Sequence, residues 1–440
     1  MKKMKRVLLQ IFLPLFLCGV MIFFSACAPR AGNDTAQNGG MTGSDEQAAL
    51  YQRQAIDLMR GTVAQVKTDT GAVNSAVGHA AATDFAVRLF QTGMKKGQNT
   101  VFSPWSVWQA LAMTANGAKG ETRTQMEQVL GMTVEELNVY VYDRQTDLQN
   151  QLHVYNALWF AGNSAFVPDP DFLQKNADYY GADAYTVPNG VSITDEVNAW
   201  ISEKTQGTIE KLLEPNAIPM AFYITDALYF QCLWKHPFGV TEGTFTCEDG
   251  TIKTVPMMHS SIGNPYLCGE HETGFVKYFY SDTPYALAVL LPEEGVAIDD
   301  YVASLTGERL AVLLRSDLAS AADVYLPRFE VSNNTSLIAI LQAMGMTDAF
   351  DVTKADLTGI GTYGGGENFA IGCAEHKSVL TVGEEGVEIA AATGFGGVFG
   401  EGIGGQEPVV VRADRPFVYT IFNRDTGVPF VIGTLMDPAA

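Results

Sequence analysis

The sequence predicts an α+β fold, and three observations carry that prediction. Residues 82–91 place Phe85, Ala86, Leu89 and Phe90 at the spacing of one helix face. Residues 224–230 are rich in β-forming side chains and lead into an aromatic cluster, as a buried strand does. Residues 376–393 begin as a strand-like run and continue as a tract of small residues. The chain therefore combines helices with strands.

Two capped helices follow the first helical segment. Ser103 is suited to cap a helix that begins at Pro104, because proline has no N–H to leave unpaired in the first turn. Leu111 and Ala112 continue this helix with small or apolar residues, and residues 117–122 supply a turn and a second cap.

One large domain is predicted for residues 79–440. About 360 residues would allow two domains by length alone. However, no linker-like break and no internal repeat interrupts them. Residues 1–26 and 27–78 are interpreted below as a signal peptide and a tether.

Near the C-terminus, an acidic hinge at Glu384 and Glu385 leads into small, β-compatible residues. The following loop is dominated by seven glycines: Gly394, Gly396, Gly397, Gly400, Gly402, Gly404 and Gly405. Strand-like sequence resumes at residues 415–419. This order describes a segment that is exposed, is cleaved and then changes place.

The same segment has two unlike faces if it becomes a strand, because strand side chains alternate. One face is almost wholly apolar: Val387, Ile389, Ala391, Thr393, Phe395, Gly397 and Phe399. The other face carries the one charge: Glu388, Ala390, Ala392, Gly394, Gly396 and Val398. A register slip of one residue would bury Glu388. The segment is therefore suited to enter a sheet with its odd-numbered face against the core.

These motifs closely resemble the serpins, a family of serine protease inhibitors, over about residues 79–438. Further matches occur in the family's order: the helix at 197–213, strands at 224–230, 255–258 and 326–331, the helix and turn at 341–357, and strands at 416–417 and 430–434. The resemblance implies the serpin fold, which has three β-sheets, about eight or nine helices and an exposed reactive-centre loop.

The resemblance also implies a suicide-type mechanism. A serine protease attacks the loop and forms an acyl-enzyme, and the cut segment then inserts into the main sheet and traps the protease. The hinge comprises Glu384, Glu385, Gly386, Val387, Glu388, Ile389, Ala390, Ala391, Ala392 and Thr393. The scissile bond is predicted within Val398, Phe399, Gly400 and Glu401. Elastase-, subtilisin- or chymotrypsin-like proteases suit this window.

By the same resemblance, Ser103, Ser106 and His376 lie where the sheet opens, and Trp234 covers the top of the opening. Asp226 stands where the family usually has asparagine. A carboxylate there would accept a hydrogen bond from His376 and raise the pKa of the imidazole. This predicts that opening of the sheet depends on pH.

Two departures bear on inhibition. Val387 stands where the family generally has threonine, and Ile389 stands where it prefers alanine. Both are β-branched and favour a strand, but the bulk of Ile389 slows insertion and lets the protease complete hydrolysis. The alternative function is therefore a non-inhibitory serpin-fold surface binding protein or a protease substrate. The small-residue hinge argues against it.

The N-terminus predicts export and anchoring. A basic start precedes an uncharged apolar stretch at residues 11–24, and Ser25-Ala26-Cys27 resembles a bacterial lipobox. Residues 1–26 are then a lipoprotein signal peptide, and lipidated Cys27 holds the protein to the membrane at the bacterial cell surface. A membrane-spanning anchor is the alternative, because residues 8–26 are almost long enough to cross a bilayer. Residues 28–46 have the composition of a flexible tether.

The charge of the chain excludes nucleic acid as a partner. The net charge is −21, and it becomes −25 without residues 1–26, which carry four positive charges. Nucleic-acid binding needs basic patches. The protein is expected to be a monomer.

The chain is not predicted to be an enzyme and needs no cofactor. It contains no GxSxG, HExxH or P-loop motif, and no two histidines stand at the spacing of a metal site on a helix. Residues 400–405 fit GxGxxG, but no helix follows them. The four cysteines of the predicted domain, Cys232, Cys247, Cys268 and Cys373, allow two disulfides or free thiols, and the sequence leaves both open.

Overall fold

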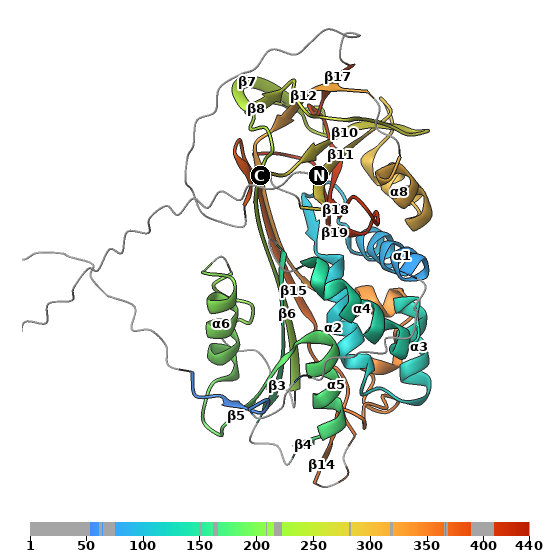
Figure 1. Cartoon of the computed structure of the whole chain (residues 1–440), viewed down its shortest axis with the longest axis vertical. Coiled ribbons are helices and arrows are strands. Elements are labelled where there is room, and N and C mark those ends of the chain that lie inside the picture. The colour runs from blue at the N-terminus through green and yellow to red at the C-terminus, as the bar shows by residue number, and fades with distance from the viewer. Residues whose placement is uncertain are drawn as a thin grey trace, which may run out of the picture. The chain divides into compact units, whose positions relative to one another are not determined.

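The structure is a computed structural model. It describes residues 53–60, 64, 75–148, 152–161, 166–207, 209–214, 222–280, 283–316, 320–364, 366, 368–388 and 409–439. Helices and strands both contribute to one unit that begins at Tyr51, as the α+β prediction requires (Figure 1).

Nine α-helices and one short 3₁₀ helix lie in this described part of the chain. They are α1 (Ser75–Gly93), α2 (Pro104–Ala115), α3 (Gly120–Leu130), α4 (Val134–Leu148), α5 (Pro170–Tyr180), α6 (Ile193–Lys204), α7 (Ile298–Ser304), α8 (Gly307–Leu314), α9 (Ile338–Ala343) and the 3₁₀ helix Asp348–Phe350. Among the described residues, no helix has both the length and the apolar character that crossing a membrane requires.

The main sheet has seven strands in the order β1-β5-β3-β6-β16-β15-β13. Their bounds are β1 (Ile56–Asp57), β3 (Leu152–Ala161), β5 (Asp183–Val187), β6 (Phe222–Leu233), β13 (Phe329–Ser336), β15 (Glu375–Val382) and β16 (Gly386–Glu388). Long strands β6 and β15 run through the middle of the molecule (Figure 1). The strand order is not the chain order, so distant segments meet in this sheet.

Three further sheets complete the strands. The six-stranded sheet contains β2 (Thr100–Phe102), β19 (Pro429–Leu435), β18 (Phe417–Asn423), β11 (Tyr285–Pro292), β10 (Glu272–Tyr278) and β9 (Tyr266–Cys268). The four-stranded sheet contains β17 (Val409–Arg412), β12 (Ala322–Pro327), β8 (Ile252–Ser260) and β7 (Gly239–Thr246). A small pair joins β14 (Gly361–Tyr363) to β4 (Phe166–Pro168). The predicted three sheets are therefore present, with one small sheet in addition.

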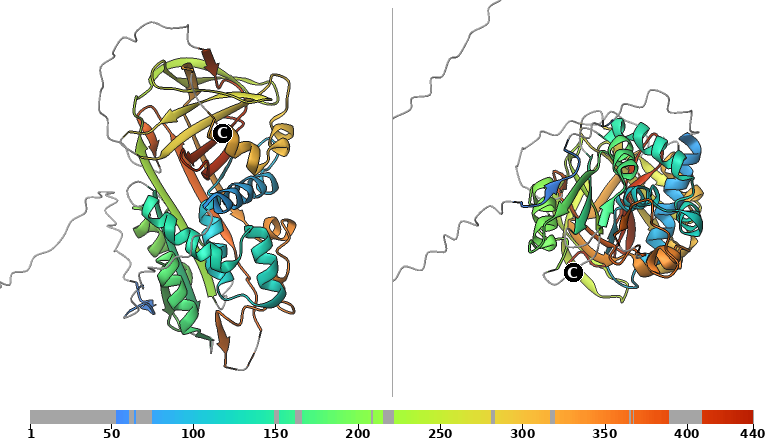
Figure 2. Two further views of the ribbon diagram at one scale, coloured as in Figure 1. Left: turned by 45° about the vertical axis from the view of Figure 1, so that its right-hand side comes forward. Right: turned by 90° about the horizontal axis from the view of Figure 1, so that it is seen from below.

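Both faces of the main sheet are covered. Helix α6 lies on one face, and α1 to α5 lie on the other (Figures 1 and 2). Under α6, Trp159 of β3 meets Trp200 edge to face at 5.9 Å, and its indole N–H donates to the Thr225 hydroxyl over 2.9 Å. The opposite face packs on the large core. Because both faces are buried, a new strand in this sheet must present suitable side chains to each.

The predicted helix caps differ from those observed. Ser103 and Pro104 do stand at the start of α2, but the Ser103 hydroxyl makes no capping hydrogen bond. Helix α3 begins at Gly120 without a side-chain cap, and Thr122 instead accepts a hydrogen bond from the Asp356 N–H over 2.9 Å. At α3 a contact with a distant segment thus replaces the local cap.

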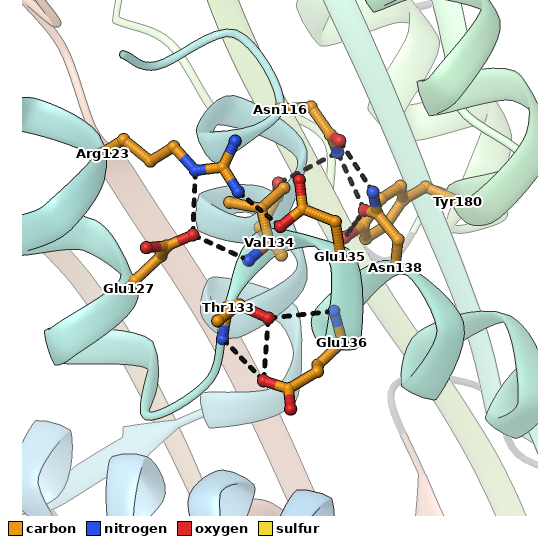
Figure 3. Close-up of polar contacts among 10 residues, drawn as sticks. Asn116, Arg123, Glu127, Thr133, Val134, Glu135, Glu136, Asn138 and Tyr180 are labelled. Carbon is orange, nitrogen blue, oxygen red and sulfur yellow. Dashed lines mark hydrogen bonds and ion pairs between the residues drawn. The ribbon is translucent and has the colours of Figure 1, made fainter. Parts of the chain in front are cut away.

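A polar network joins α3 to α4 (Figure 3). Thr133 and Glu136 form a capping box: the Glu136 N–H donates to the Thr133 hydroxyl over 3.3 Å, and the Thr133 N–H donates to the Glu136 carboxylate over 3.0 Å. Arg123 of α3 pairs with Glu127 in its own helix and with Glu135 of α4. Pairing with Arg123 lowers the pKa of Glu135. The network fixes the angle at which the chain enters α4.

Part of the segment predicted to be a tether belongs to the fold. Ile56 and Asp57 form β1 and pair antiparallel with β5 at the edge of the main sheet. The Gln54 N–H donates to the Glu196 carboxylate over 2.6 Å, and Arg53 pairs with Glu203 over 3.2 Å. These contacts attach the segment to α6. The prediction missed it because two residues are too few to show a strand period.

Candidate functional site

Three residues of the predicted hinge form strand β16 (Gly386–Glu388) inside the main sheet. Strand β16 pairs antiparallel with β6 on one side and with β15 on the other. Val387 stands opposite Cys232 of β6 and Val382 of β15. The chain therefore returns from β15 through a tight turn and enters the sheet beside the strand it has just left.

Main-chain hydrogen bonds hold this turn. The Trp234 N–H donates to the Glu385 carbonyl over 2.8 Å, and the Phe238 N–H donates to the Glu384 carbonyl over 2.9 Å. The Trp234 indole N–H donates to the Gly383 carbonyl over 2.8 Å. The indole ring is buried and stacks on Phe279 at 4.8 Å. Trp234 thus lies against the turn, and its predicted role in covering the opening of the sheet stays a prediction.

Gly386 and Val387 show why these residue types occur here. A Cβ atom on Gly386 would lie 2.3 Å from the Cys232 carbonyl oxygen, so only glycine allows β16 to approach β6 this closely. Val387 is 1% exposed and points into the core. This placement agrees with the predicted odd-numbered core face of the segment.

Strands β6 and β15 are connected to each other only through the short strand β16 in the described part of the sheet. Only three of the twelve residues of β6 pair with β16. Among the described residues, no pairing joins β6 directly to β15. Unpaired backbone groups inside a sheet are costly. In the described part of the chain, most backbone groups on the facing sides of β6 and β15 therefore have no strand partner, and an added strand could pair with them.

His376 lies at the start of β15, beside α2. The Ser103 N–H donates to His376 Nε2 over 3.0 Å, and the Ser378 hydroxyl lies 2.8 Å from the same nitrogen. The ring stacks on Phe102 with centroids 5.9 Å apart. Because Nε2 accepts from a backbone N–H, the imidazole is neutral, with its proton on Nδ1.

Several buried polar atoms around this position have no hydrogen-bond partner among the described residues. They are Ser103 Oγ, Ser106 Oγ, Asn156 Oδ1 and Thr335 Oγ1. Thr335 pairs with His376 across the sheet, and Asn156 pairs with Asp226. The side chain of Asp226 is outside the described residues, and its bond to His376 stays a prediction. Buried polar atoms without partners are costly, so they are expected where hydrogen bonds are exchanged when the sheet opens.

The predicted rise in the pKa of His376 is wrong. Burial lowers this pKa to about 4, because the charged imidazolium loses its hydration. The position of Ser103 acts in the same direction, because protonation of Nε2 would set two N–H groups against each other. A sequence pattern that pairs a carboxylate with a histidine does not reveal this burial.

We expect the lowered pKa to make the native fold sensitive to acid. The folded pKa is about 4 and the ordinary value is 6.5, so the unfolded chain binds the extra proton between these values. The contribution of neutral His376, on the order of 3 kcal/mol, is present above pH 6.5 and is lost as the pH falls to 4. Urea unfolding at pH 7 and pH 4.5 measures it. His376→Gln should lose less stability over this interval, and equal losses would contradict the assignment.

Charged groups near the turn include two that the sequence did not single out. Arg328 pairs with Glu384 over 3.4 Å, but exposure makes this pair weak. Lys277 is buried, and its ammonium donates to Ser260 and Asn264 over 2.8 and 2.9 Å. Burial lowers the pKa of Lys277 to about 7. Lys277 is flanked by apolar residues in an ordinary strand sequence, so no local signal marks it.

Other predicted residues lie outside the described part of the chain. They are Ile389, Ala390, Ala391, Ala392, Thr393, Val398, Phe399, Gly400, Glu401 and Cys27. Glu388 is described only by its backbone, as the last residue of β16.

The four cysteines of the domain are free thiols and form no disulfide with one another. Cys232, Cys247, Cys268 and Cys373 are all free. Burial raises the pKa values of Cys232 and Cys373 to about 11, so these two are poor nucleophiles.

The fold and site define a class of protein whose main sheet holds the start of its own loop between two parted strands. The family model Serpin (serine protease inhibitor) matches residues 80–438, and the chain belongs to the serpin family. It is 28% identical to an uncharacterized serpin-like protein of Thermococcus kodakarensis over 435 residues, covering 95% of this chain and 97% of the relative.

Solved serpin structures have the same fold as this chain. The native-state crystal structure of tengpin, a thermophilic serpin, has a TM-score of 0.80 and 32% identity, covering 88% of this chain and 100% of tengpin. Its latent-state structure has a TM-score of 0.72 and 31% identity, covering 85% of this chain and 100% of that one. The predicted serpin fold is therefore confirmed. Serpins are typically non-enzymatic inhibitors, which confirms the prediction that this chain is not an enzyme.

Proposed function

We propose that this protein inhibits serine proteases by a suicide mechanism. The observation that carries the proposal is the place of β16, which starts a strand between β6 and β15 without filling the space between them. A cut loop has a strand position ready to extend into. The apolar odd-numbered face of the segment that begins at Val387 suits the buried side of that position.

The protease supplies the chemistry. Its serine oxygen attacks a carbonyl carbon in the window Val398–Glu401, the peptide C–N bond breaks, and the new amino terminus leaves. The protease stays attached to the inhibitor through an ester. Fourteen residues, 387–400, span about 46 Å as a strand, so insertion carries the protease that far along the sheet. Displacement on this scale distorts its active site before water completes hydrolysis.

Insertion is strongly favourable. Each added ladder hydrogen bond contributes a net ~0.5–1.5 kcal/mol. Roughly ten such bonds, with burial of the apolar face, release on the order of 10–20 kcal/mol. The unfilled edges of β6 and β15 store this free energy in the native fold.

The test mixes the purified full chain with elastase-, chymotrypsin-, subtilisin- and trypsin-type proteases. A band at the summed mass on a denaturing gel shows covalent trapping, and the sequence of the released peptide gives the scissile bond. Cleavage between Val398 and Glu401 without such a band for any protease would contradict inhibition. It would favour the alternative of a non-inhibitory binding protein or substrate.

We also propose that the protein is an exported lipoprotein anchored through Cys27 at the bacterial cell surface. The support is the lipobox-like sequence after an uncharged apolar stretch. Cys27→Ser should abolish labelling by radioactive palmitate and move the protein out of the membrane fraction. Retention of the label in this variant would contradict lipidation at Cys27.

A further inference from the structure

A cavity of about 60 Å³ lies behind the lower part of the main sheet, where β6 and β15 are apart. Its walls come from five segments and are about equally apolar and polar, with Thr114, Glu375 and His376 among the lining residues. Helix α2 contributes Val107 and Leu111, α9 contributes Leu341, and β6 contributes Ile224. The 3₁₀ helix contributes Phe350, and Ala374 directly precedes β15. The cavity therefore faces the strand position that β16 begins to fill.

The register of β16 determines which loop residue reaches this cavity. Val387 stands level with Cys232 and Val382. Because β16 is antiparallel to both neighbours, each later residue of the loop stands opposite the preceding residue of β6 and of β15. Continued for eight residues, the register places Phe395 between Ile224 and Ala374, both of which line the cavity.

The alternation of side chains directs Phe395 inward. Val387, Cys232 and Val382 share the core face and are at most 6% exposed. Residue 395 is an even number of positions from Val387, so it shares this face. Among core-facing residues 389–397, Phe395 is the one aromatic side chain, and its neighbours Thr393 and Gly397 are small.

We propose that this cavity is the receptor for the Phe395 side chain in the inserted loop. The inference rests on the proposed insertion of the loop and adds to it a specific anchor. Phe395 lies outside the described residues, whereas every residue that lines the cavity lies within them.

The size of the cavity suits such an anchor. It is smaller than the ~150 Å³ of an engineered cavity that binds free benzene. It holds the outer part of one ring while the rest of the side chain occupies the space between the strands. The ring fills a void whose walls otherwise lack contacts on one side. Insertion down to residue 395 is therefore favoured over a partial insertion that stops earlier.

The experiment measures the stability of the cut chain. The purified full chain is cleaved by a subtilisin-type protease, the cut site is verified by mass spectrometry, and guanidinium unfolding of intact and cut protein is compared. Loss of a buried ring in Phe395→Ala should lower the midpoint of the cut form by roughly 0.5–1 M. The midpoint of the intact form should stay within about 0.2 M of wild type.

Two further variants control the result. Phe399→Ala removes the same ring, but the register places residue 399 beyond Phe222, the first residue of β6, so the cut form should keep its midpoint. Ala110→Leu adds a side chain that fills the cavity from α2. It should destabilise the cut form when Phe395 is present, and much less when combined with Phe395→Ala.

The outcomes separate the two proposals. If the cut wild-type chain gains no resistance to guanidinium, the loop does not insert, and both the inhibitory mechanism and the receptor are wrong. If it gains resistance but Phe395→Ala and Phe399→Ala behave alike, insertion stands and the receptor assignment is wrong. An equal effect of Ala110→Leu with and without Phe395 also overturns the assignment.

Discussion

Replacement of Val387 by aspartate is expected to abolish covalent trapping while the loop is still cleaved. Val387 is 1% exposed between Cys232 and Val382. A carboxylate there, with no cation beside it among its strand neighbours, costs several kcal/mol to bury. The hinge then leaves the sheet, and insertion begins too slowly to precede hydrolysis. The fraction of protease in the gel-stable complex should fall by more than about tenfold, since 1.4 kcal/mol already corresponds to a factor of ten.

Val387→Thr is the matched control for this substitution. Threonine keeps the β-branched shape and carries no charge, so complex formation should stay close to that of wild type. The released C-terminal peptide should be the same in all three proteins. A Val387→Asp chain that traps protease as efficiently as Val387→Thr would show that the hinge does not need to be buried.

Trp234→Ala is expected to destabilise the native fold by about 3–5 kcal/mol, because it empties a fully buried site. The lost contacts include the stack on Phe279 and the hydrogen bond to the Gly383 carbonyl. At about 2 °C per kcal/mol, Tm should fall by roughly 6–10 °C. Differential scanning calorimetry measures this shift.

Trp234→Phe separates the two contacts. It keeps an aromatic ring against Phe279 and removes the indole N–H, which leaves the Gly383 carbonyl without this donor. A loss of about 1 kcal/mol, or roughly 2 °C, is expected. If alanine and phenylalanine cost the same, the ring stack contributes little and the hydrogen bond dominates.

Much of the fold could be predicted because its elements carry local signals. The alternation in residues 387–399 assigned Val387 to the core face, where the structure places it. The start of α2 at Pro104 follows from the missing proline N–H. These features depend on residues near one another in the chain.

The remaining features depend on distant contacts. Burial lowers the pKa of His376, and the Ser103 N–H that donates to its ring lies 273 residues away in the chain. Strand β1 is too short to have a period and is defined by its partner β5. The cavity that faces the parted strands is built from helices and strands that the sequence does not place together.

The place where the main sheet would accept a strand, between β6 and β15, also bears on how readily the protein aggregates. Within the described residues, β1 and β13 are the two edges of the main sheet, and edges are where sheets aggregate. A strand that enters between β6 and β15 leaves both edges as they were. The sheet can therefore grow wider without offering neighbouring molecules a new row of unpaired backbone groups. The short β1, flanked by Arg53 and ending at Asp57, keeps one of these edges small and charged throughout.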